Sequence, residues 1–247
     1  MTSLLKRNTT TTNPTKKGHT VATTENSVPY KGDDAVQTMA KKMAWPLLGM
    51  GAMTVVGSLG LAIAGGINFG DFFSPAGVAA DLGRGEALVQ LTGAFMFLGM
   101  GLILAAITMT LVNIVRHLRD AGRDVQISLG AQPLQLKKPW TGTATPMLMM
   151  MGVMTEIVAF IIGITAAVSI GGVDPGSIAN PSGASGADLA DIGFTRAVGT
   201  WLPGLRLTGL AMILIAIVLV LTTIQKVIRF QGDRVSDIAR DAQAVAV

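Results

Sequence analysis

Four long apolar segments, separated by polar ones, dominate the hydropathy pattern of the chain. They cover residues about 44–66, 87–115, 146–172 and 205–226. A helix needs about 20 apolar residues to cross a bilayer, and each segment has roughly that length. The pattern therefore predicts an all-α integral membrane protein with four transmembrane helices.

Composition strengthens this prediction and removes several classes of function. The mean hydropathy is +0.54 and 14% of the residues are charged, whereas soluble domains have about 25% charged residues. The chain has no cysteine and only two histidines, which excludes disulfides, thiolate metal sites, cysteine nucleophiles and histidine-rich metal clusters. We therefore predict a protein without a cofactor or metal centre that is not an enzyme.

The polar segments predict how the chain is divided. Residues 1–36 are rich in Thr, Asn and Lys, a composition typical of a disordered tail. We expect a first hairpin repeat over 37–127, a cytoplasmic connection over 128–145 and a second repeat over 146–247, which ends in a cytoplasmic helix. The segment from 173 to about 204 is dense in Gly, Pro, Ser and Asp, which indicates a loop. No short apolar region follows the first basic residues, so we expect the first span, not a cleaved signal peptide, to direct insertion.

The basic residues indicate an orientation in the membrane. Of the 19 Lys and Arg residues, 7 precede the first span, 5 lie between the second and third spans (residues 116–138) and 4 lie at or beyond the end of the last span. Basic residues flanking spans favour the cytoplasmic side, so both termini and the central connection should be cytoplasmic, in the plasma membrane. The helical patterns of the second and fourth spans continue past the apolar stretch, so those helices should extend into the cytoplasm. Because sidedness accounts for the basic charge, we expect no nucleic-acid partner.

The two halves of the chain resemble each other in four matches that occur in the same order. The matching pairs are KKMAWPLLGMGAMT with KKPWTGTATPMLMMMGVMT, AGGINFGDFFSPAG with SIGGVDPGSIANPSG, LTGAFMF with LTGLAMI, and NIVRHLRDAGRDV with QKVIRFQGDRV. We interpret them as two tandem parallel helical hairpins, an internal duplication related by a pseudo-twofold axis along the membrane normal. Aligning Met53-Thr54 with Met154-Thr155 places Val55 opposite Glu156.

Glu156, near the middle of the third span, is the main candidate site residue. An ionisable group at this depth costs at least a few kcal/mol and needs a partner or water. One hypothesis is a structural role, in which a protonated Glu156 bonds to Thr54, Thr108, Thr155 or a partner subunit. The other is proton or ion transfer. We identify no intramembrane base for a relay, which favours the structural role.

Small residues at four-residue spacing predict faces where helices approach closely. Gly60 and Ala64 lie on the first span. Ala159, Gly163 and Ala167 lie on the third span, on the same face as Glu156. We expect both faces to pack against other helices.

Two further sets of residues are weaker candidates. Thioethers four residues apart could bind Cu(I), but methionine is also an adaptable packing residue, and we favour packing for Met147, Met151, Met150 and Met154. Basic residues at the ends of the second and fourth helices should contact anionic lipid headgroups or an acidic partner. They are Arg116, Arg119, Arg123, Lys226, Arg229 and Arg234.

Taken together, these patterns favour a non-catalytic accessory or scaffold subunit of a larger plasma-membrane complex, such as an energy-converting or oxidising one. Its expected partners are other membrane subunits and anionic lipids. The alternative is a small oligomeric transporter or channel that uses Glu156 in proton or ion transfer.

Overall fold

The computed structural model describes residues 27–30, 35–74 and 79–245. Among them, four helices are long and apolar enough to cross a membrane. This confirms the prediction of an α-helical chain with four such segments and indicates a multi-pass membrane protein. In chain order the elements are β1 (Ser27–Pro29), α2 (Ala35–Phe72), α3 (Ala79–Ser128), β2 (Leu134–Leu136), α4 (Trp140–Gly172), α5 (Pro175–Ala179), η1 (Pro181–Gly183) and α6 (Gly186–Val245).

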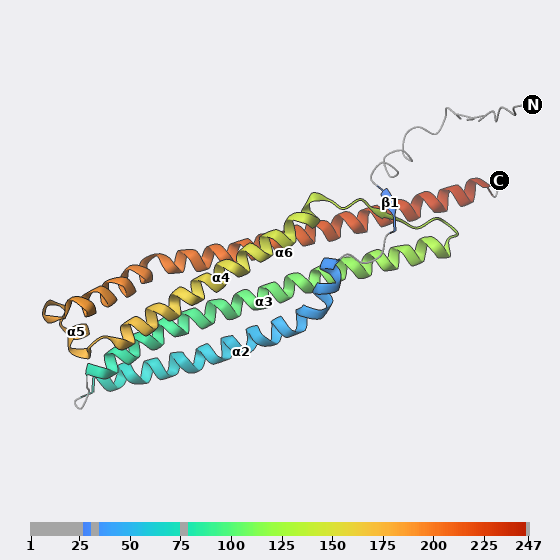
Figure 1. Ribbon diagram of the computed structural model, residues 1–247. Helices are drawn as coiled ribbons and strands as arrows, with labels where there is room; N and C mark the ends of the chain where they lie inside the picture. The colour runs from blue at the N-terminus through green and yellow to red at the C-terminus, as the bar shows by residue number, and fades with distance from the viewer. Residues whose placement is uncertain (1–26, 31–34, 75–78, 246–247) are drawn as a thin grey trace, which may run out of the picture. The chain divides into compact units, whose positions relative to one another are not determined.

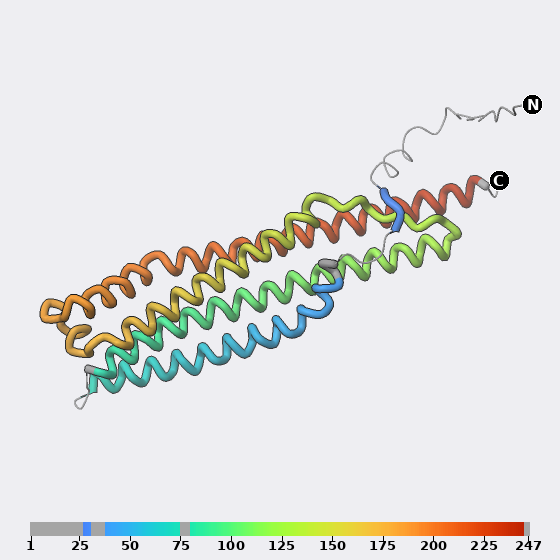
Figure 2. Tube along the Cα trace, in the orientation of Figure 1, coloured from blue at the N-terminus to red at the C-terminus, as the bar shows by residue number. Residues whose placement is uncertain are grey.

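The chain divides into two compact units. The four-helix unit comprises residues 33–117 and 138–225, and the strand-bearing unit comprises residues 1–32, 118–137 and 226–247. The helices α3 and α6 contribute residues to both units. Within the four-helix unit, α2, α3, α4 and α6 run alongside one another (Figures 1 and 2).

Glycines bring the helices of the four-helix unit close together. A Cβ atom added to Gly51 of α2 would lie 2.9 Å from the carbonyl oxygen of Gly99 in α3. A Cβ atom added to Gly152 of α4 would lie 2.8 Å from the carbonyl oxygen of Gly209 in α6. Since no larger residue fits between these backbones, glycine allows the helices to make van der Waals contact at these two points. The four-helix unit also has a buried cluster with one residue from each long helix: Ala40, Met109, Met149 and Ala216.

The segment 173–204 is largely helical, so the prediction of a loop there is wrong. Two short helices, α5 and η1, follow α4, and α6 begins at Gly186. Asp174 caps α5 by accepting a hydrogen bond from the Ser177 N–H (3.2 Å). An apolar cluster holds the segment in place, and its members are Ile170, Val173, Ile178 and Ile192. Tertiary burial therefore overrides a composition that is locally typical of loops.

The strand-bearing unit is built on a two-stranded antiparallel sheet. Val28 of β1 faces Gln135 of β2 in the register. The buried side chain of Gln126 donates to the Leu134 carbonyl (3.0 Å) and accepts from the Leu134 N–H (2.8 Å), which fixes β2 against α3. The prediction of disorder over 1–36 is therefore wrong for residues 27–29, because β2 offers a backbone edge to which they bond. It is also wrong for residues 35–36, which belong to α2, whereas residues 1–26 and 31–34 lie outside the described part of the chain.

Candidate functional site

Glu156 lies in a notch formed by two glycines on neighbouring helices. Its side chain is only 2% exposed. A Cβ atom added to Gly101 of α3 would lie 3.1 Å from its Cγ, and one added to Gly209 of α6 would lie 2.6 Å from its Oε1. Any larger residue at Gly209 would therefore overlap the carboxyl group. The two glycines provide the space that the buried acid occupies.

Arg206 of α6 is the buried base that we did not identify from the sequence. It is 6% exposed. Its guanidinium lies between two other glycines, because a Cβ atom at Gly93 would be 2.8 Å from Nη1 and one at Gly163 would be 2.7 Å from Nη2. The Cζ atom is 5.5 Å from the centroid of the Phe97 ring, a cation–π distance. Our conclusion that no intramembrane base is present was wrong.

The acid and the base lie among the same three helices without bonding to each other. Both carboxylate oxygens of Glu156 and the Nε and Nη2 atoms of Arg206 are buried and have no hydrogen-bond partner. Leaving a charged group in this state costs more than the roughly 1–3 kcal/mol of a neutral one. Nε and Nη2 form one edge of the guanidinium, which can bind a carboxylate through two parallel hydrogen bonds. The arrangement therefore offers an unused pairing site.

Helix geometry explains why the two groups are apart. The contacts of Gly152 with Gly209 and of Ala166 with Thr195 show that α4 and α6 are antiparallel. Helical side chains lean toward the N-terminus of their own helix. On antiparallel helices this direction is opposite, so the carboxyl group of Glu156 points toward the level of Gly152 and the guanidinium of Arg206 toward the level of Gly163. The two charged groups therefore point in opposite directions along the bundle, although the backbones of α4 and α6 are adjacent.

The threonines predicted to bond to Glu156 do not do so. The hydroxyls of Thr54, Thr108 and Thr155 donate to the carbonyls of the residues four positions earlier, at 2.7, 2.9 and 2.8 Å. Thr54 and Thr155 are partly exposed. A threonine in a helix can satisfy its hydroxyl through its own backbone, so these residues need no partner on another helix.

The two predicted packing faces have different surroundings. Ala159, Gly163 and Ala167 of α4 are buried inside the unit. Gly60 of α2 is exposed, and no described atom lies within 4 Å of where its Cβ atom would be. Ala64 is partly exposed. Small residues therefore line one filled interface and one open face.

The structure does not gather the weaker candidates into a binding site. Met147, Met150, Met151 and Met154 are all exposed on α4. The described residues contain no group of three His, Cys, Asp or Glu side chains that could hold a metal. Among the basic residues, Lys226 and Arg229 are exposed, whereas Arg116, Arg119 and Arg234 are partly buried.

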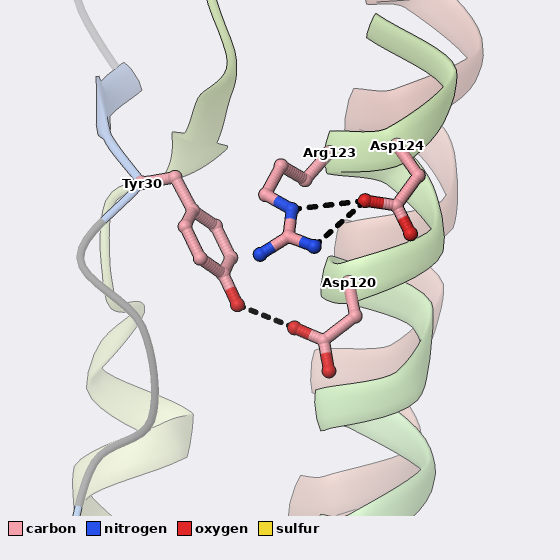
Figure 3. A network of polar contacts seen from close by, with 4 residues as sticks. All are labelled: Tyr30, Asp120, Arg123 and Asp124. Atoms are coloured by element: carbon pink, nitrogen blue, oxygen red, sulfur yellow. Dashed lines mark hydrogen bonds and ion pairs between the residues drawn. The ribbon is translucent and has the colours of Figure 1, made fainter. Parts of the chain in front are cut away.

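Arg123 belongs to a polar network in the strand-bearing unit (Figure 3). Its Nε and Nη2 atoms donate to Asp124 at 3.0 and 2.8 Å, and its Cζ atom lies 5.0 Å from the centroid of the Tyr30 ring. The Tyr30 hydroxyl donates to Asp120. Within the chain Arg123 belongs to this network, and its side chain is 38% exposed, so the contact with lipid headgroups or an acidic partner stays a prediction.

Arg206 could have been found from the sequence. It is the second residue of the apolar stretch that we placed at about 205–226, but we did not consider it as a charged residue inside a span. Because α6 begins at Gly186, Arg206 is well inside the helix. No family model, curated protein or solved structure matches the chain. The geometry of these residues is therefore the basis for assigning a function.

Proposed function

We propose that the chain is a non-catalytic accessory or scaffold subunit of a larger plasma-membrane complex, and that α2 binds a helix of the next subunit. The supporting observation is the exposure of α2. Within its most apolar stretch 11% of the residues are buried, against 33%, 28% and 33% in the other three long helices. Lipid alone can cover such a face, so the residues on the face decide whether a lipid or a helix fits it better.

Glycines on the outer face of α2 favour a helix over lipid. Gly49, Gly57 and Gly60 are exposed, with no described atom within 4 Å of a Cβ position. The large exposed side chains of Met53 and Val56 lie among them. Association of membrane helices depends on close packing, and small residues permit it. A face with glycine hollows between large apolar side chains fits a single apolar transmembrane helix.

Matching contacts in the two hairpins support the proposed tandem duplication. Gly51 packs on Gly99 and Ile103 in the first hairpin, and Gly152 packs in the same way on Gly209 and Ile213 in the second. In the last of the four sequence matches Gly122 aligns with Gly232, which is 110 residues later in the chain. Gly99 and Gly209 are also 110 residues apart. The LTG match would pair Gly93 with Gly209 instead, so we now propose the alignment that the packing favours.

In this proposal the termini and the central connection face the cytoplasm, and α3 and α6 extend into it. The concentration of Lys and Arg in these segments supports this orientation. Anionic lipids remain proposed partners of the basic helix ends. Each of the two proposed repeats would then begin and end on the cytoplasmic side of the membrane.

A specific observation also favours the second candidate function, a small oligomeric transporter or channel that uses Glu156 in proton or ion transfer. Arg206 supplies the charged partner whose apparent absence had weakened this hypothesis. Both groups are nevertheless more than nine-tenths buried in the described chain, and a transport route would need water to reach them from both sides of the membrane. We therefore place this function second.

The test compares an α2 variant with a matched variant on α6. Gly57→Leu/Gly60→Leu fills the proposed docking face, whereas Gly204→Leu fills an equally open glycine position elsewhere. We expect the wild type and Gly204→Leu to migrate with other subunits after mild-detergent extraction, native electrophoresis and mass spectrometry, and the α2 variant to migrate as a folded single chain. Migration of the wild type alone, or as a homo-oligomer, would overturn the proposal and favour the transporter.

A further inference from the structure

The buried acid and base of the four-helix unit carry an inference that does not depend on any partner subunit. Two oppositely charged side chains, 2% and 6% exposed, present four polar atoms without a hydrogen-bond partner. Four glycines leave space around them: Gly101 and Gly209 at the carboxyl group, and Gly93 and Gly163 at the guanidinium. Buried polar groups are normally bonded, so such a concentration of exceptions requires an explanation.

The observed arrangement fits a neutral Glu156. A carboxylate in this notch would be desolvated, and neither of its oxygens has a hydrogen-bond partner in the observed arrangement, which is strongly unfavourable. A protonated carboxyl group avoids most of that cost. Arg206 meanwhile keeps a favourable contact with the face of Phe97. The separated state is therefore the state expected when Glu156 holds a proton.

An ionised Glu156 would have one available counterion. No charged residue lies on α4 besides Glu156 itself, and α6 has none other than Arg206 between Arg196 and Lys226. On α3 there is none between Glu86 and Arg116, and on α2 none between Lys42 and Asp71. The free Nε and Nη2 edge of Arg206 has the geometry that a carboxylate binds through two hydrogen bonds. Rotation of these two long side chains toward each other would form that pair.

We propose that Glu156 and Arg206 form a proton-binding switch with a separated state and a paired state. In the separated state Glu156 is a neutral acid in the Gly101 and Gly209 notch. When its O–H bond breaks, the proton passes to a water molecule as hydronium, and the resulting carboxylate accepts hydrogen bonds from Nε–H and Nη2–H of Arg206. Proton uptake reverses the step and returns Arg206 to Phe97.

The hairpin comparison indicates that this switch belongs to one half of the chain. Where Gly152 corresponds to Gly51, Glu156 corresponds to Val55. Where Gly209 corresponds to Gly99, Arg206 corresponds to Met96. The first hairpin thus has two apolar residues at the positions that carry the acid and the base in the second.

The experiment is pH-difference infrared spectroscopy on the full-length protein in lipid nanodiscs. We expect the wild type to show conversion of a buried carboxylic acid to a carboxylate, and Glu156→Gln to lose that signal. Glu86→Gln, which removes a less buried carboxylate from α3, is the matched control and should keep it. Arg206→Met should raise the proton affinity of Glu156 by about 10- to 1,000-fold, the usual effect of losing a nearby opposite charge.

Arg206→Lys provides a second variant in case Arg206→Met does not fold. It keeps the positive charge but lacks the two-donor edge, so the proton affinity should lie between those of the wild type and Arg206→Met. A signal that survives Glu156→Gln would show that Glu156 does not titrate. An unchanged titration in both Arg206 variants would show that the two groups are not coupled. Either result would overturn the switch.

Discussion

The outer face of α2 and the inner face of α4 carry the same kind of sequence pattern and differ in what covers them. The space beside Gly163 of α4 is occupied by the guanidinium of Arg206 and the methyl group of Ala94. At Gly60 of α2, no described atom lies within 4 Å of where a Cβ atom would be. A small residue therefore permits the close approach of another group. Only the tertiary structure shows whether a group of the same chain takes that place.

The comparison also separates two uses of glycine inside the unit. At Gly152 the missing side chain lets two backbones touch, which is a packing role. At Gly209 it also leaves room for the carboxyl group of Glu156, whose Oε1 would lie 2.6 Å from an added Cβ atom. The carboxyl group of Glu156 is thus part of the helix interface, and substitutions at Gly152 and Gly209 should change the stability of the unit for different reasons.

The largest effect is expected from filling the packing glycine of α4. Gly152→Leu would place a side chain against the Gly209 carbonyl and Ile213, neither of which can move far because both belong to a packed helix. We expect a loss of about 3 kcal/mol or more of unfolding free energy, at the upper end of overpacking effects. Reversible unfolding in detergent measures it. A stability like that of the wild type would contradict the close approach of α4 and α6.

A smaller effect is expected from displacing the buried acid. Gly209→Ala should destabilise the unit by about 1–3 kcal/mol, because its methyl group would overlap Oε1 of Glu156. Removing the acid in the same chain, in Gly209→Ala/Glu156→Ala, should recover part of that loss. A double-mutant cycle should give a coupling of about 0.5–3 kcal/mol. Additive effects of the two substitutions would mean that the carboxyl group does not occupy the notch.

A hydroxyl pair tests the same contrast between inside and outside. The Thr223 hydroxyl donates its hydrogen to the Leu219 carbonyl (2.9 Å). The Thr141 hydroxyl is therefore the donor in its hydrogen bond with Oγ1 of Thr223 (2.8 Å). Thr141→Val should cost about 0.6 kcal/mol, the average for a hydrogen bond between membrane helices. Thr165→Val, which alters an exposed hydroxyl bonded only to its own helix, is the control and should cost less.

The smallest effect on stability is expected on the outer face of α2. Gly60→Leu adds a side chain where no described atom lies nearby, so unfolding of the isolated chain should change by no more than about 0.5 kcal/mol. The same substitution should weaken assembly if α2 binds another subunit. A large destabilisation of the isolated chain would show that this face is packed within the chain, and the comparison with α4 would fail.

Sequence alone determined the four apolar helices, the burial of Glu156 and the close packing of α4, because length, hydropathy and residue spacing are properties of each segment. It did not reveal that Arg206 is buried among the same three helices as Glu156, since the burial of Arg206 depends on where α6 begins and on which helices surround it. Nor did it reveal β1, whose hydrogen bonds come from β2 more than a hundred residues away, or that the glycines of α2 stay open. These features were decided by tertiary structure, because each depends on the atoms that other segments bring to the same place.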